Sequence, residues 1–185
     1  MSTRGELRFE IRPIGDVDPA VVREFFARIP EGDRTFFRED VLTPGVVEAW
    51  AGSESDRRFV ALVDGDVVGY LALVPDVGWS AHVAEIRIVV DPEQRRCGIG
   101  RALARHAVVT AAAQGTAKLT VHVVAEQQPT IDMFAALGFT PEGLMKDQVR
   151  SASGEVHDLL LLAHEVDELW DTMSAAGISD AVESP

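Results

Sequence analysis

The chain has 185 residues, of which 46% are apolar and 25% are charged, a balance typical of one soluble globular domain. Its net charge of −13 argues against nucleic-acid binding, which needs a basic surface, and suits either a cationic partner or simple solubility. Because there is no membrane-length apolar stretch, no secretory signal and only one cysteine, we expect a cytoplasmic protein without membrane contact or internal disulfide.

The first half of the chain predicts a strand, two helices and a hairpin. Residues 7–13 alternate apolar and charged side chains, as a half-buried strand does. Asp18 before Pro19 is typical of a helix start, and Asp64-Gly65-Asp66 is typical of a tight hairpin turn. The predicted elements are a strand at 7–13, a helix at 18–28, an irregular stretch at 30–34, a helix at 44–51 capped by Thr43, and strands at 59–63 and 67–74.

The second half predicts helices and strands in alternation, followed by a second hairpin. The elements are a strand at 83–90, a helix at 100–114, a strand at 118–124, a helix at 130–137, strands at 144–150 and 156–163, and a helix at 164–176. Since helical and hairpin connections both occur, we expect a mixed, mostly antiparallel sheet of about seven strands flanked by helices. Residues 1–164 are expected to form one domain, and 165–185 a C-terminal helix with a frayed acidic tail.

The most informative segment connects the strand at 83–90 to the helix at 100–114. After the turn Asp91-Pro92, residues 95–101 contain three arginines and the two glycines Gly98 and Gly100. The first N–H groups of a helix have no intrahelical partner, and the helix dipole is positive there, so an anion is stabilised at that end. A glycine lacks Cβ, which lets the backbone approach a ligand closely. The segment therefore predicts a cradle for a phosphorylated ligand.

Two common phosphate loops do not fit this segment. A Walker A loop needs Lys-Ser or Lys-Thr where Arg101-Ala102 stands, and a dinucleotide fingerprint needs a third glycine where Leu103 stands. A basic surface connection that binds nothing is the remaining alternative.

The pattern Arg95-x-x-Gly98-x-Gly100, with its preceding strand and following helix, resembles the acyl-CoA pyrophosphate loop of the GNAT superfamily of N-acetyltransferases. A second segment, residues 127–139, is also similar to that family, most clearly in Leu137-Gly138-Phe139. In this segment Gln127 replaces the family's asparagine and Phe134 its tyrosine. The resemblance covers residues 7–163 and implies the GNAT fold.

The resemblance implies that the chain binds acetyl-CoA as acetyl donor. The backbone of Ile88, Val89 and Val90 would pair with the pantetheine arm as an added strand. Gln127 and Phe134 are the expected contacts from the second segment. The pyrophosphate would lie on Arg95, Arg96, Cys97, Gly98, Ile99, Gly100 and Arg101, with Cys97 as a loop residue rather than a nucleophile. The five histidines show no metal-ligand spacing, so no metal is expected.

Glu85 is the candidate general base. It lies in an otherwise apolar strand, where carboxylates are rare without a partner or a purpose, and burial disfavours the charged form of a carboxyl group. The alternative is a salt bridge to Arg87, two residues along on the same face, and both interpretations can hold together. The amide of Val89 or Val90 could donate to the oxyanion that develops on the thioester.

Phe134 has no hydroxyl with which to return a proton to the departing CoA thiolate, as the family's tyrosine commonly does. We therefore expect a slower enzyme or another acid, with water and His122 as candidates. Tyr70 is expected to be a packing residue. If the lost hydroxyl limits the rate, Phe134→Tyr should raise turnover.

These observations predict an N-acetyltransferase in which a primary amine attacks acetyl-CoA directly. The phenylalanine-rich stretch at 25–40 weakly resembles the acceptor region of bacterial protein-lysine acetyltransferases, which favours a lysine side chain as acceptor. A small amine such as an antibiotic or polyamine is the alternative acceptor. A non-catalytic acetyl-CoA-binding module is the alternative function, and a homodimer is a possible oligomeric state. No nucleic-acid or membrane partner is expected.

Overall fold

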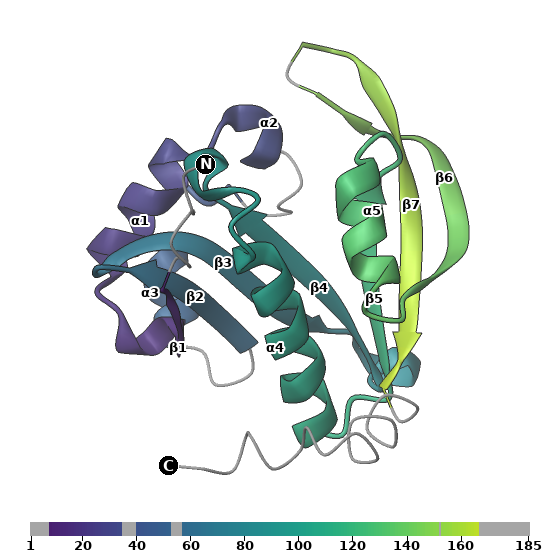
Figure 1. Cartoon of the computed structure of the whole chain (residues 1–185), viewed down its shortest axis with the longest axis horizontal. Helices are drawn as coiled ribbons and strands as arrows, with labels where there is room; N and C mark the ends of the chain where they lie inside the picture. The colour runs from purple at the N-terminus through teal and green to yellow at the C-terminus, as the bar shows by residue number, and fades with distance from the viewer. Residues whose placement is uncertain (1–7, 35–39, 53–56, 152, 167–185) are drawn as a thin grey trace, which may run out of the picture.

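The computed structural model describes residues 8–34, 40–52, 57–151 and 153–166. A seven-stranded sheet in the order β1-β2-β3-β4-β5-β7-β6 forms its centre, as predicted (Figure 1). Neighbouring strands run antiparallel except β4 and β5. The strands are β1 (Glu10–Pro13), β2 (Arg57–Val63), β3 (Asp66–Pro75), β4 (Val83–Val90), β5 (Lys118–Val124), β6 (Thr140–Arg150) and β7 (Val156–Glu165).

Helices cover both faces of the sheet. Helices α1 and α3 pack on one face, and α4 and α5 on the other. None of the helices in the described part of the chain is long and apolar enough to cross a membrane. The helices are α1 (Pro19–Arg28), α2 (Glu31–Arg34), α3 (Val46–Ala51), α4 (Ile99–Ala113) and α5 (Gln128–Ala135), with 3-10 turns η1 (Ile14–Asp16), η2 (Gly78–Ser80) and η3 (Pro92–Gln94).

Local sequence signals place several element boundaries. The Asp18 carboxylate accepts a hydrogen bond from the Ala20 N–H at 2.8 Å, so Asp18 caps α1 as predicted. Asp64 and Gly65 both have positive φ, 51° and 93°, and this left-handed pair makes the tight turn between β2 and β3.

Four predicted boundaries are wrong. The strand expected at 144–150 already begins at Thr140, which pairs with Ala163 of β7. The stretch at 30–34 is not irregular, because residues 31–34 form the helical turn α2. Helix α3 is capped by Gly45 rather than by Thr43, whose carbonyl accepts from Val46 N–H in a preceding turn. The chain does not turn helical at His164, because β5 still offers ladder partners and β7 continues to Glu165. The rest of the predicted terminal helix, from residue 167, lies outside the described residues.

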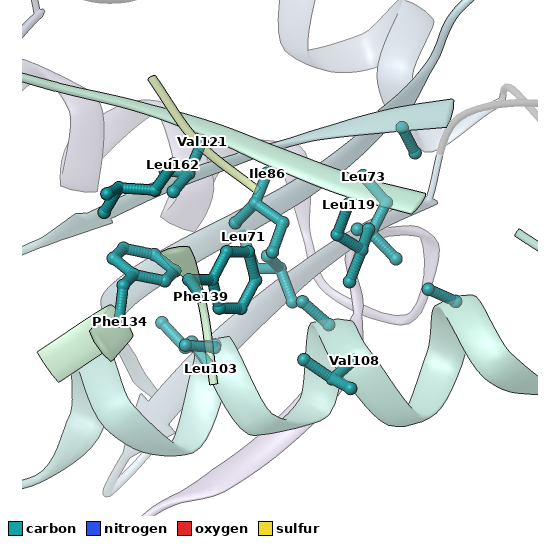
Figure 2. Packing of buried hydrophobic residues seen from close by; sticks show 14 of the residues in the cluster. Leu71, Leu73, Ile86, Leu103, Val108, Leu119, Val121, Phe134, Phe139 and Leu162 are labelled. Atoms are coloured by element: carbon teal, nitrogen blue, oxygen red, sulfur yellow. The ribbon is translucent and has the colours of Figure 1, made fainter. Parts of the chain in front are cut away.

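Helix α4 lies very close to β3, and this contact sets the position of its N-terminus. Gly69 of β3 has no side chain, and a Cβ there would come within 3.0 Å of both Ile99 and Leu103. Leu103 belongs to the core between the sheet and helices α4 and α5, together with Phe134 and Phe139 (Figure 2). A second core lies under α1 and α3 on the opposite face.

Strands β4 and β5 pair at only three positions and then diverge. The paired residues are Val83 with Lys118, Ala84 with Leu119, and Glu85 with Thr120. Beyond Glu85, β4 continues to pair with β3 on its other edge, while β5 bends away toward α5 (Figure 1). We call the diverging stretches, Ile86–Val90 of β4 and Val121–Val124 of β5, the fork.

Candidate active site

The loop at the C-terminal end of β4 presents the N-terminus of α4. Arg96 and Gly98 both have positive φ, 63° and 86°, and Gly98 is the N-cap of α4. Gly98 has no side chain with which to cap the helix, and no side-chain cap is made by the described residues. The first N–H groups of α4 therefore receive no side-chain cap from Gly98, and their binding of an anion stays a prediction.

The arginines of the phosphate loop, residues 95–101, differ in their partners. The Arg95 guanidinium donates to the Asp33 carboxylate of α2 at 2.6 Å and to the Val90 carbonyl at 3.3 Å. Arg96 and Arg101 are exposed. Arg95 is thus held by α2 and the end of β4, although all three arginines are exposed to solvent. The Cys97 thiol contacts the Arg95 carbonyl at 3.6 Å within the same turn.

The start of the loop is fixed by α1. Asp91 is buried, accepts from the Glu93 N–H at 3.0 Å, and contacts Arg28 of α1 at 3.4 Å. Arg28 also donates to the Val67 carbonyl of β3 at 2.8 Å. No local pattern indicated Arg28 or Asp33, because their carboxylate and guanidinium partners, Asp91 and Arg95, lie 63 and 62 positions away.

The two loop glycines leave space on the protein side. A Cβ on Gly98 would meet no atom within 4 Å, and a Cβ on Gly100 would lie 3.6 Å from Val90 and 3.7 Å from Met133. Neither contact is a clash, so packing within the protein does not require glycine at either position. Gly98 is favoured by its positive φ, whereas a Cβ on Gly100 would make only ordinary contacts with Val90 and Met133.

Three polar side chains meet where the fork closes, and we call Glu85, Arg87 and His122 the fork base. Glu85 Oε2 lies 3.0 Å from an Arg87 guanidinium nitrogen, and Glu85 Oε1 lies 3.2 Å from His122 Nδ1. Their side chains are 19%, 8% and 27% exposed, respectively, so the cluster is largely enclosed, with Glu85 and His122 in partial contact with solvent. The salt bridge offered as the alternative for Glu85 is present, and His122 joins it from the other strand.

The fork base lies on the face of the sheet that carries α1 and α3. Side chains alternate along β4, and Ile86 belongs to the opposite core while Val89 packs under α1. Nearby on this face, the Tyr70 hydroxyl is a hydrogen-bond partner of Arg58, whose guanidinium lies 4.1 Å above the Trp50 ring. Tyr70 is fully buried, in keeping with the packing role expected for it.

Gln127 and Phe134 lie apart from the fork base. Gln127 is the N-cap residue of α5, where its N–H donates to the Val124 carbonyl at 2.8 Å. Phe134 is 2% exposed in the core on the α4 and α5 face, with its ring 5.1 Å from that of Phe139 (Figure 2). The sheet therefore separates the Phe134 ring from Glu85, and a contact between Phe134 and acetyl-CoA stays a prediction.

A cavity of about 210 Å³ lies between α2, the end of β5 and the hairpin of β6 and β7. From the phenylalanine-rich stretch expected to form an acceptor wall, Gly32 and Asp33 line this cavity. Phe25 and Phe26 do not, because both are fully buried under α1, and Phe36 and Phe37 lie outside the described residues. The other lining residues are Val124, Gln127, Val149, Ser151 and His157. No cluster of potential metal ligands occurs among the residues described.

Comparison with known proteins gives a consistent result. The sequence model described as "Acetyltransferase (GNAT) family" matches residues 22–139. Streptothricin acetyltransferase from Streptomyces lavendulae is 37% identical over 95 residues, which are 50% of each chain. Phosphinothricin N-acetyltransferase from Streptomyces viridochromogenes is 28% identical over 147 residues, 74% of this chain and 77% of that protein. The chain spans half or less of the length of the first curated relatives that it matches.

Solved structures show the same fold. One from Salmonella typhimurium, determined with its cofactor acetyl-CoA, superposes with a TM-score of 0.69 at 18% identity and covers 86% of this chain and 94% of that one.

Proposed function

The chain belongs to the acetyltransferase (GNAT) family, and on that premise we propose that it transfers the acetyl group of acetyl-CoA to a primary amine. The observation that carries this proposal is the position of Glu85 on the last rung of the β4–β5 ladder, at the closed end of the fork. The phosphate loop begins at the open end of the same strand. One β-strand thus joins an anion site to a carboxylate, and five residues of extended chain separate Glu85 from Val90, roughly 17 Å.

The chain's own groups have distinct tasks in binding acetyl-CoA. The helix N–H groups from Ile99 to Arg101, with the exposed Arg96 and Arg101 side chains, would hold the pyrophosphate. The backbone of Ile88–Val90, along the β4 edge that β5 does not cover, would pair with the pantetheine arm. Gln127, at the start of α5, would contact the arm from the other side of the fork.

The reaction requires a base and an oxyanion donor. An amine with a pKa near 10.4 is an ammonium ion at neutral pH and must lose a proton before it attacks. We assign this proton to Glu85, whose second oxygen is held by Arg87. A backbone N–H of Val89 or Val90 would donate to the thioester oxygen, a contribution of about 3–4 kcal/mol when such a donor is preorganised.

The acceptor is proposed to be a compact cationic amine. Two sequence relatives are named for streptothricin and phosphinothricin, and the cavity beside the fork has room for a group of side-chain size. The net charge of −13 would draw cationic acceptors toward the protein. A protein lysine carries the same ammonium group on a flexible chain and is the second candidate.

The test is an acceptor screen with acetyl-CoA, using small amines beside lysine-rich proteins and comparing wild type with Glu85→Gln. We expect CoA release with at least one acceptor in the wild type, its loss in Glu85→Gln, and acetyl-CoA binding by both. The matched control is Glu24→Gln, an exposed glutamate on α1, which should behave as wild type. If the wild type binds acetyl-CoA but transfers acetyl to no acceptor, the protein is a binding module and not an enzyme.

A further inference from the structure

The proposed reaction leaves one proton without a donor. A thiolate leaves more readily when it is protonated as the carbon–sulfur bond breaks, and general acid help is typically worth about 10²–10⁴-fold. Phe134 cannot give a proton, and its ring lies in the core on the face opposite Glu85. The acid has to be sought on the face that carries the fork base.

His122 lies on that face, on the β5 side of the fork. Its Nδ1 is 3.2 Å from Glu85 Oε1, a contact that spans 37 positions of sequence and joins the two strands just above their last rung. Its partner residue on β7 is the apolar Leu161, and among the described residues Glu85 is the only hydrogen-bond partner of the imidazole. The second ring nitrogen, Nε2, therefore has no protein partner in that part of the chain.

The two oxygens of Glu85 have different environments. Oε2 faces the buried guanidinium of Arg87 at 3.0 Å, and Oε1 faces His122. Of these two contacts, the one with Arg87 engages Oε2, which leaves Oε1 as the oxygen that faces the imidazole. An imidazole with one nitrogen on a carboxylate and the other toward a reacting atom can accept a proton at the first and release one from the second.

We propose that His122 gives a proton to the departing CoA sulfur and is recharged by Glu85. This inference rests on the proposed function. The acceptor ammonium loses one proton to Glu85 before its nitrogen attacks, and the nitrogen loses a second proton to water once the carbon–nitrogen bond has formed. The proton on Glu85 passes to His122 Nδ1, and Nε2–H is transferred to sulfur as the carbon–sulfur bond breaks. The products are the acetylated amine, CoA with its thiol restored, and one proton in solution.

The test compares two acetyl donors whose leaving groups differ in their need for a proton, and each donor is compared between wild type and variant. Acetyl-CoA releases an alkyl thiolate, whose thiol has a pKa near 8.5, whereas the acetyl thioester of 4-nitrothiophenol releases a far more acidic aryl thiol that needs no acid. The variant is His122→Asn, because the asparagine amide can keep the hydrogen bond to Glu85. We expect kcat with acetyl-CoA to fall by about 100-fold with KM within twofold, and kcat/KM with the aryl thioester to fall less than threefold.

Controls separate the possible outcomes. His82→Asn changes an exposed histidine just before β4 and should leave both rates unchanged. Added imidazole should restore activity to His122→Ala with acetyl-CoA. Equal losses with both donors, or no loss with acetyl-CoA, would overturn the role of His122 while leaving the proposed function intact. Failure of the wild type to acetylate any amine would instead refute the proposed function.

Discussion

The two ends of β4 carry the two halves of the proposed site, and they are built from different parts of the chain. In the proposed site the phosphate loop would use backbone N–H groups, with Gly98 and Gly100 contributing by their lack of a side chain. The fork base uses three side chains from two strands in direct contact. Backbone N–H groups can bind an anion but do not take up or release protons in a reaction, whereas ionisable side chains can. Substitutions in the loop should therefore change affinity, and those in the fork base should change turnover.

The largest effect is expected at the fork base, from Glu85→Gln. The amide keeps the size of the carboxylate and can still contact His122, but it cannot accept a proton. We expect kcat to fall by about 100-fold or more and the Kd for acetyl-CoA to stay within twofold, measured by steady-state kinetics and calorimetry. A large rise in Kd would mean that Glu85 helps to build the binding site, and the division between the two regions would fail.

The converse is expected in the loop, from Gly98→Val. The backbone there has φ of 86°, which a β-branched residue adopts only with strain, and the new side chain would project from the helix N-terminus over the proposed pyrophosphate site. We expect the Kd for acetyl-CoA to rise at least tenfold, with kcat at saturation within threefold. Gly45→Val is the matched control, because Gly45 is also an N-cap with φ of 90° and open space around its Cβ position. If Gly98→Val binds acetyl-CoA as tightly as Gly45→Val does, glycine is needed at position 98 for its backbone conformation and not for the cradle.

The same contrast explains what could be predicted from the sequence. The loop is local: strand, turn, arginines and glycines follow one another, so their order alone indicated an anion site. Glu85 stood out as a carboxylate in an apolar strand, and Arg87 as its neighbour. The contact with His122 depends on which strands are adjacent and in which register, and no local pattern contains that information. For the same reason the sequence showed that residue 134 is phenylalanine but not that its ring is buried away from Glu85.

A smaller effect is expected from Phe134→Tyr, which tests whether the proton donor belongs to the fork base. The added hydroxyl would enter a core in which the ring is 2% exposed and packs edge-on against Phe139. Burying an unpaired hydroxyl costs about 1–3 kcal/mol, which corresponds to a drop of several degrees in Tm for a chain of this length. Because the sheet separates this position from Glu85, we now expect turnover within twofold of wild type. A clear gain in kcat would show that the hydroxyl reaches the sulfur and would contradict the role assigned to His122.

The smallest expected effect is on stability and concerns His106 on α4. It matters for the comparison because acid unfolding would also lower activity and binding in the pH profiles of the two regions. Burial lowers the pKa of His106, whose Nε2 is enclosed without a hydrogen-bond partner among the described residues. The unfolded chain therefore binds this proton more readily than the folded chain. The resulting stability is present above the ordinary histidine pKa near 6.5 and is lost as pH falls below it, by at most about 1.4 kcal/mol per pH unit. We expect Tm to fall less steeply between about pH 7.5 and 5.5 in His106→Leu than in wild type, as followed by thermal unfolding. If Tm falls equally steeply with pH in both proteins, groups other than His106 cause the acid sensitivity of the fold. A loss of activity at low pH could then be attributed to the fork base only after those groups were found.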